Sequence, residues 1–409
     1  MVRVCVLAAG EGTRLGGGFA KPLTKICGVT FIEIVMRLAR HFDEKPLLVA
    51  SPKRPEVADA AGDCQVVWQQ NPGGTGEAVL LALNAAPGAT QLLTLCADAV
   101  LLRKQTLQAL VEHHKETEPD ATLLLMRPPG KHRYGVIRRD GRGRIVGIEE
   151  GGGIGGEVFA GVAVWDCDFL RRTLPNVRPD AKKGEVYLTA VVDGNGRFEG
   201  VECAYEEGLG VNDAGDLAAA TAIMRRRIVA QHLKNGVLIP APDLVYIEDG
   251  VEIAPQALIE PFCVIRRGVK IGAGCVVGPF SHLRAGTVLE DGAEVGNFVE
   301  CKKTRLGRRA KAKHLSYLGD GDVGEGANIG AGTIFANWDG REKHRTVVGK
   351  GAFVGSGSVL VAPCKVGDGA TTGAGAVVTR GKEVPAGGVW VGVPAKPLKN
   401  SREENRGSG

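Results

Sequence analysis

The 409-residue sequence has few aromatic residues and lacks the marks of several protein classes. Its N-terminus runs directly into the apolar segment MVRVCVLAAG without a basic leader, and no apolar run approaches about 18 residues. We therefore expect a cytoplasmic protein without a membrane partner. The net charge of +5 is modest and spread along the chain, which also argues against a nucleic-acid partner.

The ten cysteines occur singly, and neither a C-x-x-C pair nor a histidine pair has the spacing of a zinc site. We expect them to be reduced, buried thiols. Glycine is abundant, with 60 residues, but 24% charged and 44% hydrophobic residues exclude a disordered or collagen-like chain. Because one hydrophobic core rarely grows beyond about 250 to 300 residues, the length predicts two domains.

Residues 1–212 alternate short apolar runs with helix-like segments, which predicts an α/β Rossmann-like domain around a mainly parallel sheet. Asp140-Gly141 lies between two alternating runs and predicts an antiparallel hairpin. Asn212 and Asp213 offer N-cap side chains for a linking helix over residues 213–236. We expect the arginine triplet 225–227 in this helix to be a solvated face.

Residues 237–397 carry a different pattern, in which aliphatic residues recur every sixth position. The unbroken series is Ile253, Ile259, Ile265, Ile271, Val277, Leu283, Leu289 and Val295, and the period resumes at Val348 after a slip. Neither a helix nor an ordinary strand has this period. Hexapeptide repeats predict a left-handed parallel β-helix, whose flat flanks favour a homotrimer. Residues 398–409 are predicted to be a tail.

The segment LAAGEGTRLGGGFAKPL, residues 7–23, has the outline of a phosphate site. Gly10 and Gly12 let backbone N–H groups approach phosphate oxygens, and Arg14 and Lys21 add positive charge. By itself a glycine-rich loop is also typical of an ordinary turn between a strand and a helix. The more specific signal is G-x-G-T-R followed seven residues later by Lys-Pro.

This segment resembles the signature of sugar-1-phosphate nucleotidyltransferases. Over nearly the whole chain, the order of later motifs resembles the bifunctional N-acetylglucosamine-1-phosphate uridylyltransferase/glucosamine-1-phosphate acetyltransferase family. The resemblance implies that Arg14 and Lys21 are catalytic and that UTP and acetyl-coenzyme A are co-substrates. It implies a nucleotide site formed by Leu7, Ala8, Gly10, Gly12, Lys21, Gln69, Gly74 and Thr75.

The resemblance also implies that Asp98 and Asn212 hold Mg²⁺. Each residue alone has another interpretation, since a strand-end Asp can cap a turn and an Asn can cap a helix. The implied sugar contacts are Gly135, Glu150, Tyr187 and Thr189. Two features depart from the family: Phe159 stands where the family has a sugar-contacting Asn, and the loop Gly151–Gly156 is short.

The string GNFVECKKTRLGRRAKAKHLSYLGD, residues 296–320, is similar to the family's acetyltransferase site. The resemblance implies a catalytic role for His314, and a histidine, with an ordinary pKa near 6.5, suits the removal of an amine proton. Alternatively, His314 and Tyr317 only cap coil corners. The implied sugar-phosphate contacts are Arg284, Lys302, Tyr317 and Asn328.

The implied acetyl-coenzyme A contacts are Ala331, Asn337, Trp338, Lys343, Ser356 and Ala374. In the family, the inserted loop that contains Asn337 and Lys343 reaches an adjacent subunit, so we expect these two residues to complete the active site. Gly392 replaces a family Arg that pairs with the cofactor phosphate, so Arg380 or Lys396 is expected to take that role.

We therefore predict the synthesis of UDP-N-acetylglucosamine in two steps. The C-terminal domain acetylates glucosamine-1-phosphate, and the N-terminal domain transfers uridylyl from UTP to the product. Phe159 and the short glycine loop leave open a nucleotidyltransferase with a different sugar preference. A third possibility is a regulator without catalytic activity that binds sugar nucleotides.

Overall fold

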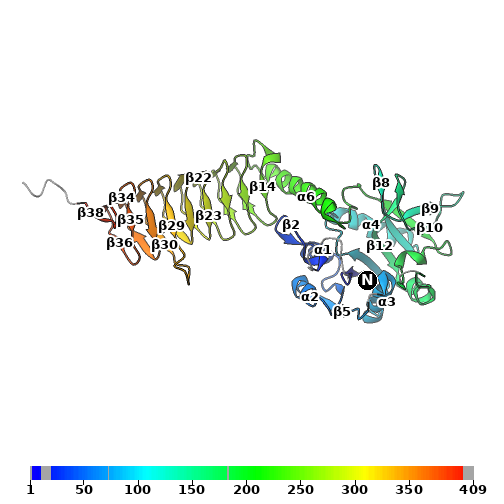
Figure 1. Cartoon of the computed structure of the whole chain (residues 1–409). Helices are drawn as coiled ribbons and strands as arrows, with labels where there is room; N and C mark the ends of the chain where they lie inside the picture. Colours follow the sequence, from blue (N-terminus) through cyan, green and yellow to red (C-terminus); the bar gives the residue numbers. More distant parts are fainter. Residues whose placement is uncertain (1, 11–19, 72, 182–183, 399–409) are drawn as a thin grey trace, which may run out of the picture. The chain divides into compact units, whose positions relative to one another are not determined.

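The computed structural model describes residues 2–10, 20–71, 73–181 and 184–398, and the chain divides into two compact units, Met1–Met224 and Arg225–Gly409. The helix α6 (Ala214–Lys234) belongs to both units (Figure 1). None of the described helices is long and apolar enough to cross a membrane.

The first unit is built around one mixed sheet with the strand order β10-β9-β12-β6-β1-β4-β5. In addition, β7 pairs with β12, and β13 pairs with β7. The strands are β1 (Val2–Leu7), β4 (Leu47–Ala50), β5 (Gln65–Trp68), β6 (Gln91–Cys96), β7 (Ala121–Met126), β9 (Val136–Arg139), β10 (Ile145–Glu149), β12 (Val158–Asp166) and β13 (Phe198–Glu202). The series from β6 to β5 is parallel, whereas β12 runs antiparallel to β6 and β7. The prediction of an α/β domain is confirmed.

Helices and short strands complete this unit. They are α1 (Phe31–Ala39), α2 (Glu56–Ala61), α3 (Gly74–Ala85), α4 (Lys104–Thr117), α5 (Cys167–Thr173), the 3₁₀ helices η2 (Lys21–Leu23), η3 (Leu174–Asn176) and η4 (Leu188–Val191), and the strands β2 (Lys25–Ile26), β3 (Val29–Thr30), β8 (Lys131–His132) and β11 (Gly153–Ile154). The predicted hairpin is confirmed, because β9 and β10 pair antiparallel around Asp140, whose N–H donates to the Arg144 carbonyl.

Local sequence explains where helices begin. Thr30 and Glu33 form a reciprocal capping box at the start of α1, which satisfies N–H groups that lack a partner within the helix. The fully buried Trp165 donates its indole N–H to Thr94 Oγ1 at 3.0 Å, which ties β12 to β6 without an unpaired polar group in the core.

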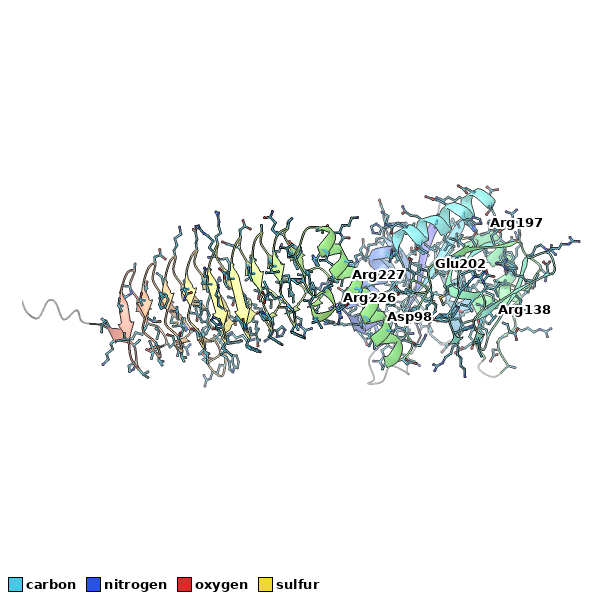
Figure 2. The ribbon with its side chains drawn as sticks, turned by 90° about the horizontal axis from the view of Figure 1, so that it is seen from above. Asp98, Arg138, Arg197, Glu202, Arg226 and Arg227 are labelled. Atoms are coloured by element: carbon cyan, nitrogen blue, oxygen red, sulfur yellow. The ribbon has the colours of Figure 1, made fainter. Side chains whose placement is uncertain are left out.

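The linking helix begins as predicted, because Asp213 Oδ1 accepts from the Asp216 N–H at 3.0 Å. The prediction that the arginine triplet is a solvated face is wrong for two of its three residues. Arg226 is exposed, but Arg225 and Arg227 are half-buried, and Arg225 donates to the Asp243 carbonyl at 2.8 Å. Figure 2 labels Arg226 and Arg227 on this helix.

All ten cysteines carry free thiols, as predicted, and eight of them are buried. Cys64 and Cys96 differ from the expectation because both are partly exposed.

After α6, the second unit continues with the short 3₁₀ helix η5 (Pro242–Leu244) and then with three sheets stacked coil upon coil, whose strands are parallel except for the last one, β38 (Figure 1). The first sheet contains β14 (Tyr246–Ile247), β17 (Val264–Ile265), β20 (His282–Leu283), β23 (Glu300–Lys302), β26 (Tyr317–Gly319), β29 (Ile334–Ala336), β32 (Val359–Val361) and β35 (Val377–Val378). The second contains β15 (Glu252–Ile253), β18 (Lys270–Ile271), β21 (Val288–Leu289), β24 (Arg305–Leu306), β27 (Gly321–Val323), β30 (Thr346–Val348), β33 (Cys364–Val366) and β36 (Glu383–Val384). The third contains β16 (Leu258–Ile259), β19 (Val276–Val277), β22 (Glu294–Asn297), β25 (Lys311–His314), β28 (Asn328–Ile329), β31 (Phe353–Val354), β34 (Thr371–Thr372), β37 (Val389–Val391) and β38 (Lys396–Pro397).

The predicted left-handed β-helix is confirmed, and the structure explains the slip in its period. The aliphatic residues at every sixth position are buried in one continuous column. Two sides of the prism are one residue short, since the buried Cys301 is followed by Leu306 and the buried Leu318 by Val323. A loop inserted between β29 and β30 then separates the buried Phe335 from Val348.

Candidate active sites

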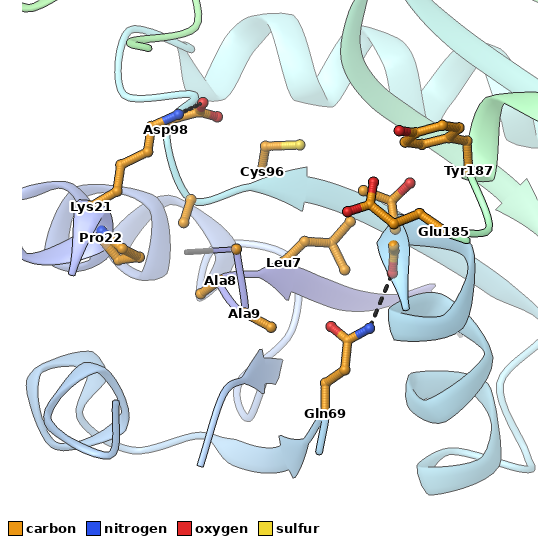
Figure 3. Close-up of a pocket in the computed structure, with 14 residues that line it drawn as sticks. Leu7, Ala8, Ala9, Lys21, Pro22, Gln69, Cys96, Asp98, Glu185 and Tyr187 are labelled. Atoms are coloured by element: carbon orange, nitrogen blue, oxygen red, sulfur yellow. Dashed lines mark hydrogen bonds and ion pairs between the residues drawn. The ribbon is translucent and has the colours of Figure 1, made fainter. Parts of the chain in front are cut away.

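A cleft of about 440 Å³ opens where the parallel strands β1 and β6 end (Figure 3). The described residues predicted to bind a nucleotide all line it, together with Asp98. They are Leu7, Ala8, Gly10, Lys21, Gln69, Gly74 and Thr75. Gly12 and Arg14 lie outside the described residues.

Three polar side chains from distant parts of the chain meet at this cleft. Lys21 Nζ lies 2.5 Å from Asp98 Oδ2 and 3.0 Å from Asn212 Oδ1. Lys21 begins η2, Asp98 follows β6, and Asn212 precedes α6, where its N–H is held by Asp216 Oδ2 at 2.8 Å. The structure therefore brings together the predicted catalytic lysine and both predicted metal ligands.

The oxygen donors in this cluster fit Mg²⁺. A carboxylate and an amide carbonyl are hard oxygen ligands, and Mg²⁺ in phosphoryl-transfer sites takes one or two protein ligands besides substrate phosphates and water. Within the described ranges, no group of three or more acidic, histidine or cysteine side chains could hold a metal. Asp98 and Asn212 therefore suit a metal that is bound together with a nucleotide.

A second hollow of about 290 Å³ adjoins the first, and both are lined by Leu7, Thr75, Cys96, Asp98 and Tyr187. All four predicted sugar contacts line this hollow. Glu150 Oε1 accepts from Thr189 Oγ1 at 2.9 Å. At Gly135 a Cβ atom would lie 2.5 Å from Ile148 Cγ2, so a larger residue would disturb this wall.

The nucleotide loop and the sugar-side segment are hydrogen-bonded to each other. Gly76 N–H donates to the Val186 carbonyl at 2.7 Å, Val186 N–H donates to Gly73, and Leu188 N–H donates to Thr75 Oγ1. Gly74 has φ +91°, and a Cβ there would lie 2.5 Å from the Val186 carbonyl oxygen. Only glycine allows this approach. The two hollows therefore share a fixed wall.

The sequence did not single out several residues that line these hollows. Burial raises the pKa of Tyr134 to about 12, and its hydroxyl is hydrogen-bonded to the Gly210 N–H. Burial, reinforced by the Asp98 charge, raises the pKa of the Cys96 thiol to about 12. Glu185 lines the nucleotide cleft. Each of these residues lies within two positions of a predicted site residue. This proximity is the only feature of the sequence that could have identified them.

In the second unit, the predicted sugar-phosphate residues follow adjacent strands. Arg284 comes directly after β20, Lys302 ends β23, and Tyr317 begins β26, three neighbouring strands of one sheet. The Arg284 guanidinium pairs with Glu300 Oε1 at 2.8 Å. Side chains from three coils thus share one face of the prism.

His314 ends β25 in the neighbouring sheet, where it pairs in register with Asn297. Its side chain is exposed. Leu315, at φ +47°, turns the corner that leads to Tyr317. Asn328 begins β28, the next strand beside β25. His314 therefore lies at the corner between the sheet that carries Asn328 and the sheet that carries Tyr317.

The inserted loop packs onto its own chain. Asn337 is buried, and its amide donates to Asp320 Oδ2. The Lys343 ammonium lies beside the Lys302 ammonium, and the contact between these like charges lowers the pKa of Lys302. The Trp338 side chain is exposed, and the backbone of Trp338 forms an isolated antiparallel β-bridge with that of Lys343. Within its own chain the Asn337 side chain is thus held against Asp320, and the expectation that this loop completes an active site with an adjacent subunit stays a prediction.

The predicted cofactor residues Ala331, Ser356 and Ala374 stack along one corner of the prism. The Ala331 carbonyl accepts from Gly357 N–H at 2.7 Å, and the Ser356 carbonyl accepts from Gly375 N–H at 2.8 Å. These bonds link the corners of three successive coils.

Arg380 and Lys396, which are expected to replace the missing family arginine, differ in what they contact. Arg380 pairs with Asp339 Oδ2 at 2.9 Å and contacts His344, so it holds the inserted loop. Lys396 is exposed on β38. Gly392 has φ +89°, a conformation that favours glycine over the family arginine.

Comparison with known proteins assigns both units to transferase classes. Residues 4–155 match the family model of the MobA-like NTP transferase domain. Residues 244–279, 268–303 and 345–380 match the model of the bacterial transferase hexapeptide, six repeats. The two folds and their sites thus define an enzyme that is both a nucleotidyltransferase and an acetyltransferase.

The particular family follows from relatives that match almost the whole chain. The sequence is 37% identical to the bifunctional protein GlmU of Rubrobacter xylanophilus over 99% of this chain and 95% of that protein. It is 35% identical to the GlmU protein of Streptococcus equi subsp. zooepidemicus, over 96% and 95%, and 36% identical to that of Pelobacter propionicus, over 95% of each. The chain belongs to the GlmU family of bifunctional proteins.

Proposed function

We propose that this chain produces UDP-N-acetylglucosamine by acetyl transfer in the β-helix and uridylyl transfer in the α/β unit, with the residues assigned below. The carrying observation is the cluster of Lys21, Asp98 and Asn212 at the boundary of two adjoining hollows. A nucleotide in one hollow and a sugar phosphate in the other would bring their phosphates to these side chains.

For uridylyl transfer, Gln69, Gly74 and Thr75 bind the base, and Glu150, Tyr187 and Thr189 bind the sugar. The sugar phosphate attacks the α-phosphorus of UTP, and pyrophosphate leaves. Mg²⁺ held by Asp98 and Asn212 would supply positive charge to the phosphates. The Lys21 ammonium adds charge beside them and orients the carboxylate of Asp98. Arg14 keeps the catalytic role expected from the sequence.

For acetyl transfer, His314 removes a proton from the amine of glucosamine-1-phosphate so that nitrogen can attack the thioester carbonyl. The exposed position of His314 supports this role, since a substrate amine can reach it. Arg284 and Lys302 bind the phosphate, while Tyr317 and Asn328 bind the sugar. Acetyl-coenzyme A lies along the corner formed by Ala331, Ser356 and Ala374 and beside Trp338. We propose that the reaction takes place in the cytoplasm, where both UTP and acetyl-coenzyme A are found.

A ridge of exposed apolar residues supports a homotrimer. Phe262, Phe280 and Phe298 stack at ring-centroid distances of 4.7 and 5.1 Å, and the exposed Leu315 is also a corner residue. All four have φ between +47° and +62°, at corners of the prism. Burial of such a ridge favours association. Because Leu315 follows His314, the active site would lie at this interface.

Sedimentation velocity tests the trimer. Phe280→Asp should shift the chain toward monomer, whereas Phe353→Asp, at an equally exposed phenylalanine on strand β31, should leave the trimer intact. Equal effects of the two substitutions, or none from Phe280→Asp, would contradict an interface along the ridge.

Phe159 supports a second candidate, a different sugar preference. Phe159 lines the sugar hollow at the position where the family resemblance implies an asparagine. Steady-state assays with Mg²⁺, four nucleoside triphosphates and a panel of sugar-1-phosphates test both candidates. The highest kcat/KM should occur with UTP and N-acetylglucosamine-1-phosphate. A higher value for another sugar would favour the second candidate, and absence of both turnovers would contradict the proposal.

A further inference from the structure

The side chain of Gln69 is held in one orientation at the nucleotide cleft. Gln69 follows β5, is 5% exposed, and donates its backbone N–H to the Ala50 carbonyl at 2.9 Å. Its amide nitrogen lies 3.1 Å from the Gly74 carbonyl oxygen and 2.7 Å from Glu77 Oε2. Both hydrogens of the amide are therefore used within the protein.

The chemistry of these two partners decides which way the amide faces. A backbone carbonyl and a carboxylate only accept hydrogen bonds, so the NH₂ group must face them. The amide oxygen is then directed away from Gly74 and Glu77. Figure 3 shows a dashed line that marks the hydrogen bond of the Gln69 amide nitrogen, and the amide oxygen points to the other side. The cleft thus presents an acceptor at Gln69.

Glu77 is itself held in place for this contact. It lies in the first turn of α3, where a negative charge is favourable. Its carboxylate fills the space beside Gly73, since a Cβ at Gly73 would lie 1.9 Å from Glu77 Oε2. The Glu77 carboxylate can therefore occupy this space only because residue 73 has no side chain.

We propose that Glu77 is a positioning residue that fixes the Gln69 amide with its oxygen toward the base and thereby selects uracil over cytosine. Uracil carries an N–H on its imide edge and donates to this oxygen. Cytosine carries an unprotonated ring nitrogen there, so two acceptors would face each other. A buried polar group left unpaired weakens binding of the wrong base. This inference rests on the proposed uridylyl transfer.

The test is the ratio of kcat/KM for UTP over CTP, measured on the full chain with Mg²⁺ and N-acetylglucosamine-1-phosphate. Glu77→Leu removes one of the two acceptors that fix the amide. The ratio of kcat/KM for UTP over CTP should then fall about tenfold because the KM values change, while kcat for UTP stays nearly unchanged. Glu77→Gln can still offer a carbonyl and should restore most of the ratio. Glu112→Leu, an exposed glutamate on α4, should have no effect.

An unchanged ratio in Glu77→Leu, or equal losses of kcat/KM for UTP and CTP, would overturn the role of Glu77. Direct binding of UTP and CTP to the same variants separates this inference from the proposed reaction. A wild-type chain that binds UTP tightly and does not transfer it contradicts the reaction. Equal UTP-to-CTP binding ratios in wild type and Glu77→Leu contradict the positioning role.

Discussion

The Lys21 ammonium and the Asp98 carboxylate form an ion pair at 2.5 Å, and the same ammonium lies 3.0 Å from Asn212 Oδ1. A cationic side chain thus contacts both oxygens proposed as metal ligands. Because a metal and the lysine would share these oxygens, charge balance at the cluster depends on Asp98.

The first prediction follows from this balance. Asp98→Asn removes the carboxylate but keeps the shape of the side chain, so formation of the UDP-sugar should fall at least about 10³-fold at saturating Mg²⁺. Acetyl transfer should continue, because its residues lie in the second unit. Separate assays of pyrophosphate release and of coenzyme A release measure the two activities.

Asp140→Asn is the matched control, since Asp140 lies in the hairpin turn and lines neither hollow. It should keep both activities. Retention of most uridylyl transfer by Asp98→Asn would show that the metal assignment is wrong.

The second prediction concerns His314. If it is the general base, His314→Ala should lower kcat for acetyl transfer by about 10² to 10⁴ and leave uridylylation of N-acetylglucosamine-1-phosphate unchanged. Lys313→Ala, on the same strand and paired with Glu294, is the control and should retain acetyl transfer. A His314→Ala chain that acetylates at nearly the wild-type rate, or that loses the trimer, would make His314 a structural residue.

The third prediction concerns two neighbouring ammonium groups. Lys343 lowers the pKa of Lys302, because the two positive charges repel each other. A bound anion would relieve this repulsion. Lys343→Met should therefore raise KM for glucosamine-1-phosphate about tenfold. Inorganic phosphate should raise the melting temperature of the wild-type chain more than that of Lys343→Met.

Lys350→Met serves as the control for this pair, because Lys350 is exposed and forms an ion pair with Glu325 instead. Its response to phosphate should equal that of the wild type. If Lys343→Met responds to phosphate as strongly as the wild type does, Lys302 and Lys343 do not form an anion site.

The fourth prediction uses a buried histidine. His114 is 1% exposed, accepts or donates a hydrogen bond with Thr122 Oγ1 at 3.0 Å, and has its pKa lowered from 6.5 to about 4 by burial. Above pH 6.5 both the folded and unfolded states are neutral at this group. Between pH 6.5 and 4 only the unfolded state binds the proton, so stability falls as the pH decreases.

His114→Gln keeps a partner for Thr122 and does not titrate. From pH 7 to 4, the free energy of unfolding of the first unit should fall by on the order of 3 kcal/mol more in wild type than in this variant. Replacing Trp338 and Trp390 by Phe leaves only Trp68 and Trp165, the two tryptophans of the first unit. Urea unfolding of these chains, followed by tryptophan fluorescence, gives the difference. Parallel pH profiles for the two chains would contradict this assignment.

Sequence alone determined the architecture of this protein because both folds have periods that report burial directly. An aliphatic residue at every sixth position can be buried only if the chain turns the same corner repeatedly, so the series from Ile253 to Val295 requires a prism. Motif order likewise located Lys21, Asp98 and Asn212 as candidates. Their roles came from resemblance, since no local pattern links residues so far apart in the chain.

Tertiary structure decided which side chains meet, because a hydrogen-bond partner depends on how strands are ordered and how loops pack. Strand order placed Lys21 between Asp98 and Asn212, and the approach of α3 to Gln69 made Glu77 its partner. In the inserted loop, the Asn337 side chain is buried against Asp320, and Asp339 forms an ion pair with Arg380. Periodicity in a sequence encodes how deeply a side chain is buried, whereas the direction of a polar group is fixed only by the neighbours that the fold supplies.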